Sequence, residues 1–203
     1  RSAIETALDR VIAQMSAWEP TSHLSRFHET EAGEWFSVPF EFQTVISCAL
    51  RIARESNGAY DPTIGSLVDL WGFGPAGMRS SPPDDDRIGA ALAASGWCKI
   101  EQTSNRRRLC RHSDLRLDLS GIAKGYAVDL VAQALHALGF TDCLVEIGGE
   151  LLGRGIKPDG TPWWVTIDTE SDDPVLVGLH ALAIATSGCE RAFSSRGTRY
   201  SHT

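Results

Sequence analysis

The sequence predicts an α+β fold, in which long helices pack against mostly antiparallel strands. Three stretches place apolar residues at helical spacing, each long enough to give a helix one continuous apolar face. Shorter stretches rich in apolar residues, several of them bounded by turn-forming residues, indicate strands. Long helices grouped with strands of this kind are typical of α+β proteins, and no internal repeat is evident.

The helices are predicted from their apolar faces and from the residues that end them. They are expected at 3–17, 40–56, 88–95 and 122–138, with a short helix inside the glycine-rich loop 58–77. Asn57-Gly58 and Gly139 directly follow two of them, as residues at helix C-termini commonly do. Helix 122–138 carries its apolar residues on one face, and we expect that face to be buried.

The strands are expected mainly in the second half of the chain. They are predicted near 97–102, 107–111, 115–119, 142–147, 163–168, 178–185 and 198–203. In the third of these, Leu115, Leu117 and Leu119 alternate with polar residues, which is the period of a strand with one buried side.

Composition excludes several classes of protein. The chain has 203 residues, of which 42% are hydrophobic and 22% charged, as in ordinary globular domains. Its net charge of −7 argues against nucleic acid as a partner, since phosphates require a basic surface. Arg106, Arg107 and Arg108 follow a polar turn, and we expect them to be solvated. The five cysteines include no C-x-x-C pair and are odd in number, so we expect most of the thiols to be buried and neither a zinc site nor a disulfide framework.

The two ends of the chain indicate a fragment. It begins directly in an amphipathic helical pattern and stops in a predicted strand. We therefore expect a longer protein that is truncated here at both ends, and the missing leader carries no information on secretion.

The segment DLSGIAKGYAVD (118–129) is a candidate phosphate site. In it, Ser120 can cap the helix and Gly121 permits close backbone approach. The free N–H groups of the first helical turn attract anions, and Lys124 adds a positive charge nearby. Asp118 can accept hydrogen bonds from a ligand or help to hold a cation. The segment matches neither the P-loop nor the dinucleotide-binding glycine pattern, so an ordinary strand–turn–helix with an exposed lysine is the alternative.

Three further segments end strands or helices in small residues, which together could form the rim of a nucleotide site. They are GAYDPTIG (58–65), EIGGELLGRG (146–155) and AIATSG (183–188). Each can also be only a turn. Trp18 can pack against the fold or stack on a planar ring. His202 can be structural or can act as a general base in a cleft.

Taken in order, these segments resemble the ApbE family of FAD:protein FMN transferases. The matching stretches are MSAWEPTSHLSRFH (15–28), GAYDPTIGSLVDLWGFG (58–74), DLSGIAKGYAVD (118–129), EIGGELLGRG (146–155), ATSG (185–188) and RYSH (199–202). They span nearly the whole chain, so the resemblance implies one flavin transferase domain over residues 1–203. It also implies an α+β fold whose core is T-fold-like.

The resemblance implies an enzyme that binds FAD with Mg²⁺. Such enzymes move the FMN half of FAD onto a Thr or Ser hydroxyl of an acceptor flavoprotein and release AMP. The acceptors implied are subunits of membrane redox complexes, and the location implied is the periplasmic face of the inner membrane, reached by a lipid anchor outside this chain. A Mg²⁺-dependent FAD pyrophosphatase and a non-catalytic FAD-binding protein are the alternatives.

The resemblance also assigns roles to residues of this chain. It implies that FAD contacts Trp18, Ala59, Tyr60, Asp61, Asp118 and Lys124, that the Gly121 carbonyl binds magnesium, and that His202 is the catalytic base. The sequence departs from the family at His28, where Asn is usual, and in CERAF after ATSG. The Asp-Pro turn and the Asp/Thr metal-binding segment that follow RYSH in the family are not in this sequence. If the fragment were the whole protein, weak magnesium binding and little turnover would be expected.

Overall fold

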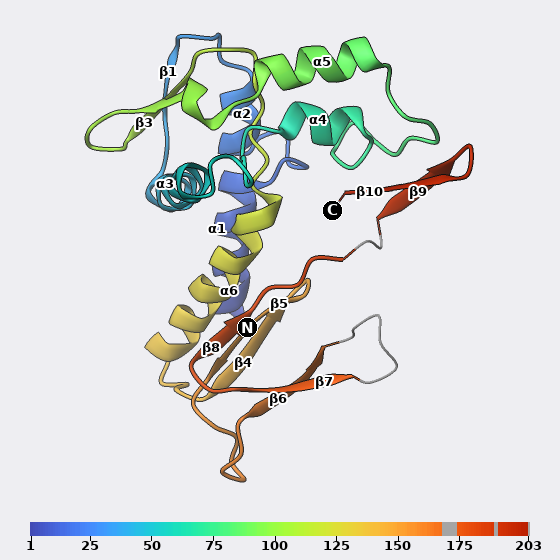
Figure 1. The fold of residues 1–203 in the computed structure, drawn as a ribbon. Coiled ribbons are helices and arrows are strands. Elements are labelled where there is room, and N and C mark those ends of the chain that lie inside the picture. Colours follow the sequence, from blue (N-terminus) through green and yellow to red (C-terminus); the bar gives the residue numbers. More distant parts are fainter. Residues whose placement is uncertain (168–173, 189–190, 203) are drawn as a thin grey trace. The chain divides into compact units, whose positions relative to one another are not determined.

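A computed structural model describes residues 1–167, 174–188 and 191–202 and confirms the predicted α+β fold. The chain forms two compact units. The first comprises residues 1–9 and 124–187, and the second comprises residues 10–123 and 188–203. Two helices, α1 (Ser2–Met15) and α6 (Ser120–Ala137), run from one unit into the other. Figure 1 shows both as continuous helices.

The second unit is built from short helices, one long helix and two small antiparallel sheets. Its helices are α2 (His23–His28), α3 (Phe40–Glu55), α4 (Gly65–Leu70), α5 (Asp85–Ala94) and the 3₁₀-helix η1 (Trp97–Lys99). Its strands are β1 (Trp35–Ser37), β2 (Ile100–Gln102), β3 (Arg108–Arg111), β9 (Ala192–Ser195) and β10 (Thr198–Ser201). They pair in the order β1-β3-β2 and as a β9–β10 hairpin. The apolar stripe of α3 that the sequence predicts is buried here.

The first unit is a set of antiparallel strands covered by helix. The strands are β4 (Cys143–Ile147), β5 (Glu150–Arg154), β6 (Trp163–Ile167), β7 (Val175–Leu179) and β8 (Leu182–Ile184). They pair as β4-β5-β8 and β6-β7. Val128, Val131 and Ala132 of α6 pack against Val145 and Leu152 in one buried cluster, so α6 covers β4 and β5 (Figure 1).

The prediction of a strand at 115–119 is wrong. This segment is extended, but with the described residues it forms a single parallel bridge, between Ile64 and Arg116. Its alternating leucines are fully buried, so the alternation correctly predicted that one side of the segment is buried. A strand also needs a continuous ladder, and here the available backbone partner is a loop: the Asp118 N–H donates to the Pro62 carbonyl and the Gly65 N–H to the Arg116 carbonyl.

Other differences are smaller. The polar loop after the first helix contains α2, which begins where the Ser22 side chain accepts from the Ser25 N–H. The single strand expected at 178–185 is two strands, interrupted at His180 and Ala181, where Ala181 has a φ of +53°. Of the four described cysteines, all free, only Cys110 is buried, so the expectation of buried thiols is wrong for the other three.

Residues 168 and 203, which end the strands predicted at 163–168 and 198–203, lie outside the described residues, and so does Cys189. No helix in the described part of the chain is both long and apolar enough to cross a membrane.

Candidate functional site

The loop that contains Ala59-Tyr60-Asp61 is held against the segment that leads into α6. Gly65 makes this approach possible, because a Cβ at this position would lie 2.8 Å from the Leu117 carbonyl oxygen. The same contact carries the Tyr60 ring next to the start of α6, where a Cβ on Gly121 would lie 3.5 Å from Tyr60 Cε2. The structure therefore brings together Tyr60, Asp118 and Gly121, as the predicted site requires, while Ala59 is exposed at the edge of the loop.

The Tyr60 hydroxyl is a buried donor with no hydrogen-bond partner among the described residues. Burial raises the pKa of Tyr60 to about 12, and the negative charge of Asp118, followed by Cys48 and Asp61, adds to the shift. The phenol therefore stays protonated at neutral pH and keeps its O–H to donate. We call the loop 59–61 together with residues 118–121 at the start of α6 the corner. Since buried tyrosine hydroxyls usually find a partner, this corner offers one donor to a ligand.

The two predicted aspartates already have partners within the protein. Asp61 Oδ1 accepts from the N–H (2.8 Å) and the hydroxyl (2.6 Å) of Thr63, and its Oδ2 accepts from the Trp97 N–H at 3.2 Å. Asp118 accepts from the N–H and the hydroxyl of Ser120 at 2.8 and 3.0 Å. Both carboxylates therefore shape the corner. The expected cap by Ser120 is wrong, because Ser120 is the first residue of α6 and its hydroxyl donates to Asp118.

The corner provides few oxygen ligands for a metal. No group of three or more His, Cys, Asp or Glu side chains within residues 1–167, 174–188 and 191–202 could hold a metal ion. At the start of α6 the Asp118 carboxylate lies beside Gly121, whose carbonyl the resemblance assigns to the metal. Magnesium takes six oxygen ligands and commonly keeps waters and substrate phosphates, so these two groups fit it only together with a phosphate ligand.

Lys124 lies in the first unit and is held by the β4–β5 turn. Its ammonium donates to the Gly148 carbonyl at 2.9 Å and pairs with the Glu150 carboxylate at 2.6 Å. The turn itself is Gly148-Gly149, both with positive φ, as a two-residue hairpin loop requires. The Thr186 hydroxyl donates to the Gly149 carbonyl at 3.0 Å. The structure thus joins Lys124 to two of the predicted small-residue segments, and its contact with phosphate stays a prediction.

Trp18 and His202 both contact Arg191. The Trp18 side chain is 61% exposed, and the Arg191 guanidinium carbon lies 5.7 Å from its ring centroid. The Arg191 carbonyl lies 3.1 Å from Nδ1 of His202. Because a carbonyl oxygen can only accept, Nδ1 carries the proton, and in the neutral ring Nε2 is then the basic nitrogen.

Aromatic packing fixes the hairpin that carries His202. Phe193 and Tyr200 stack with 5.2 Å between ring centroids, and Trp71 lies 5.4 Å from Tyr200. Phe73 contacts both Phe193 (6.0 Å) and His202 (5.9 Å). These contacts belong to the preferred range for aromatic pairs, so Phe193 of β9 and Phe73 in the loop after α4 position the imidazole.

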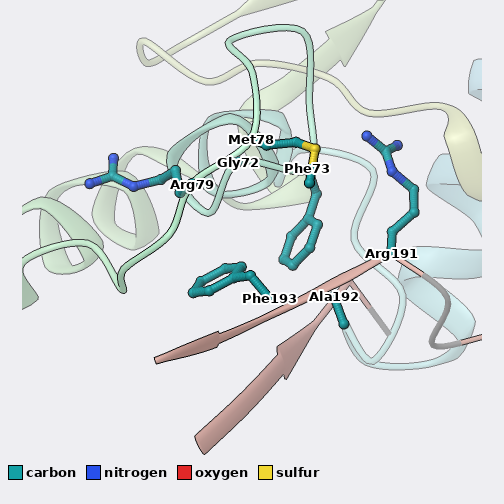
Figure 2. Close-up of a pocket in the computed structure, with 7 residues that line it drawn as sticks. All are labelled: Gly72, Phe73, Met78, Arg79, Arg191, Ala192 and Phe193. Carbon is teal, nitrogen blue, oxygen red and sulfur yellow. The ribbon is translucent and has the colours of Figure 1, made fainter. Parts of the chain in front are cut away.

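A pocket opens beside these rings (Figure 2). It is lined by Gly72, Phe73, Met78, Arg79, Arg191, Ala192 and Phe193. In the view of Figure 2 the rings of Phe73 and Phe193 lie next to each other, and the two arginine side chains extend on opposite sides of them. None of these residues was predicted from the sequence to be functional. The aromatic-rich run at 71–73 was the available signal, but its partner near 191 is distant in the sequence.

Comparisons with known proteins agree with the fold and with the motifs. The model of the ApbE family matches residues 1–203. A Vibrio cholerae protein named FAD:protein FMN transferase is 38% identical over 209 residues, which cover 100% of this chain and 62% of that protein. An Escherichia coli K12 protein of the same name is 32% identical, with 100% and 60% covered.

Solved structures give the same result. The apo form of flavinyl transferase ApbE from Pseudomonas stutzeri superimposes with a TM-score of 0.91 at 37% identity, covering 100% of this chain and 64% of that one. The ApbE protein from Thermotoga maritima gives a TM-score of 0.89 at 31% identity, with 99% and 66% covered. The chain therefore spans roughly three fifths of the length of the relatives that it matches. Since the family model matches every residue of it, this chain belongs to the ApbE family.

Proposed function

We propose that this chain is the flavin-transferring part of an enzyme that moves FMN from FAD onto a Thr or Ser hydroxyl of an acceptor flavoprotein and releases AMP. Relatives named FAD:protein FMN transferase support the reaction class. The observation in the structure that carries the proposal is the bond from His202 Nδ1 to the Arg191 carbonyl. It leaves Nε2 free to accept the proton of an attacking hydroxyl.

The reaction needs one bond made and one broken at phosphorus. The acceptor oxygen attacks the phosphorus on the FMN side of the pyrophosphate, and its proton passes to Nε2 of His202. The bond from that phosphorus to the bridging oxygen breaks, and AMP leaves with this oxygen. The product is a phosphodiester between the acceptor side chain and riboflavin.

The start of α6 is the proposed pyrophosphate site. The Tyr60 hydroxyl and the Gly121 N–H are the donors available there, because the Ser120 N–H already donates to Asp118 and the N–H groups of the two residues after Gly121 donate to the Leu119 carbonyl. Asp118 and Gly121 are the residues that would contribute oxygens to magnesium, together with the substrate's own phosphates. Magnesium, when bound, neutralises charge on the pyrophosphate and makes attack by a hydroxyl easier.

Mass spectrometry tests the reaction. The full protein is incubated with FAD, Mg²⁺ and a Thr-bearing acceptor protein. A gain in acceptor mass equal to FMN supports the transferase. Free FMN and AMP with an unmodified acceptor identify a pyrophosphatase instead, and bound but unchanged FAD identifies a binding protein.

Two histidine variants test the assigned base. His202→Ala should bind FAD with unchanged affinity and transfer FMN at least 100-fold more slowly, the usual contribution of a general base. His180→Ala is a matched control, because its Nδ1 is likewise bonded to a backbone carbonyl, that of Gly155, at 2.9 Å. The control should keep the full rate, and a full rate for His202→Ala as well would make His202 structural.

We further propose that the acceptors are subunits of membrane redox complexes and that the protein works at the periplasmic face of the inner membrane. The support is the family resemblance of the motifs. Fractionation of cells that produce the full protein, with detection in the periplasmic membrane fraction, tests this location. Recovery in the cytoplasmic fraction would contradict it.

A further inference from the structure

The pocket beside His202 has no role in the chemistry proposed above. Its volume is about 180 Å³. That is close to the ~150 Å³ that a benzene-sized group occupies and below the ~300–1,000 Å³ typical of sites for larger ligands. The pocket therefore fits one apolar side chain and is too small for a flavin or a whole nucleotide.

Two kinds of chemistry line the pocket. Phe73 and Phe193 give it an aromatic wall, and Met78, which is 85% exposed, lies at its mouth. A flexible thioether of this kind adapts to differently shaped partners. Arg79 and Arg191 flank the rings, and neither forms an ion pair with any residue that the structure describes. An apolar group with acidic neighbours complements this surface.

The pocket is directly connected to the proposed base. Phe73 lines it and contacts the His202 ring, and Arg191 lines it and holds His202 Nδ1 through its carbonyl. In contrast, Tyr60 and Asp118, at the predicted pyrophosphate site, do not line it. The reactant that must bring a hydroxyl to His202 Nε2 is the acceptor polypeptide.

We propose that this pocket docks the acceptor, taking an apolar side chain next to the modified Thr or Ser while acidic residues of the same segment pair with Arg79 and Arg191. This inference rests on the proposed function, since that function defines the acceptor. The pocket would then select acceptors by the sequence around the hydroxyl, which is a separate property from FAD binding.

Peptide binding tests the surface without any chemistry. The probes are fluorescently labelled 12-residue peptides with a central Thr: one with a neighbouring Leu flanked by Glu, one with Lys in place of Glu, and one with Ser in place of Leu. We expect the Leu–Glu peptide to bind the full protein at least 10-fold tighter than either of the others. Equal binding of the three peptides, or displacement of the Leu–Glu peptide by AMP, would overturn the proposal.

Charge reversal at Arg79 tests whether the peptides bind in the pocket. Arg79→Glu should abolish the preference for the Leu–Glu peptide and favour the Lys peptide. Arg87→Glu makes the same charge change at an exposed position of α5 outside the pocket and should leave the preference intact. An unchanged preference in Arg79→Glu would contradict the pocket assignment.

Transfer kinetics separate this inference from the proposed function. In the FMN-transfer assay, Arg79→Glu should raise KM for the acceptor at least 10-fold and leave kcat and FAD affinity within two-fold. If the wild-type protein transfers FMN but KM is the same in Arg79→Glu, the docking inference fails and the transferase stands. If the wild-type protein binds FAD and never modifies an acceptor, the proposed function fails and the inference fails with it.

Discussion

His28 should make the stability of this protein depend on pH in a defined range. The side chain is 9% exposed, and its Nε2 accepts the Leu117 N–H at 2.9 Å. Burial lowers the pKa of His28 to about 3, and the positive charges of Arg116 and Arg111 contribute to this shift. The native state therefore holds a neutral imidazole at every pH above about 3.

The sign of the effect follows from proton binding. The unfolded chain protonates this histidine below its ordinary pKa of 6.5, whereas the native state does so only near pH 3. The full contribution to stability is therefore present above pH 6.5 and is lost as the pH falls from 6.5 towards 3. Each unit in this range costs about 1.4 kcal/mol by the general relation between pKa and free energy, so the loss from pH 7.5 to pH 4.5 is about 3 kcal/mol.

Urea unfolding followed by far-UV circular dichroism measures this loss. The control is His28→Gln, whose amide oxygen can accept the Leu117 N–H but does not titrate. Between pH 7.5 and pH 4.5 the wild-type protein should lose about 3 kcal/mol more than the variant. Equal losses in the two proteins would refute a native imidazole that stays neutral.

Three further changes test the structure around the site. Arg111 is 5% exposed, and its guanidinium donates to the carbonyls of His28 and Leu115. Arg111→Met should therefore lower the free energy of unfolding in urea by about 3 kcal/mol, and a decrease below about 1 kcal/mol would contradict its bracing role. Tyr60→Phe should stabilise the ligand-free protein by about 1–3 kcal/mol in urea unfolding, because it removes the unsatisfied buried hydroxyl, and should weaken FAD binding by about 5–150-fold in a fluorescence titration. Lys124→Ala should weaken FAD binding and also destabilise the fold by about 1–3 kcal/mol, because it leaves the Glu150 carboxylate without its ion pair. Unchanged FAD affinity in either of the last two variants would remove that residue from the binding site.

The long helices could be predicted from the sequence because the apolar stripe that identifies each of them lies within its own residues. Helix α3 begins at the predicted residue 40 and ends one residue before the predicted end, since its buried stripe repeats over four turns. Helix α2 has only six residues, too few for a period to be visible, and its start depends on the single cap by Ser22. The prediction of a strand at 115–119 was wrong for another reason. A strand is defined by its hydrogen-bonded partner, and the partner of this segment is a loop.

The candidate site could be predicted in part. The motifs indicated that Tyr60 and the start of α6 lie together, and the structure places them so because Gly65 permits the close approach of its loop. The link from Trp18 to Arg191 could not be predicted, since it joins residues far apart in the sequence and depends on how the β9–β10 hairpin packs. The use of Asp61 and Asp118 as internal acceptors was also not evident, because a carboxylate in a loop suits either role.

The partners that the predicted flavin-binding residues already have determine where binding energy can come from. Asp61 is bonded to Thr63 and Trp97, Asp118 to Ser120, and Lys124 to Gly148 and Glu150, while the Trp18 ring has the Arg191 guanidinium on its face. A ligand that engages one of these groups must replace an existing interaction, so its net gain is small. The buried Tyr60 hydroxyl has no bond to replace, and an unsatisfied buried donor carries a cost of about 1–3 kcal/mol that a ligand acceptor removes. We therefore expect the Tyr60 hydroxyl to supply more affinity for FAD than the charged side chains, whose main effect is to hold the corner in shape.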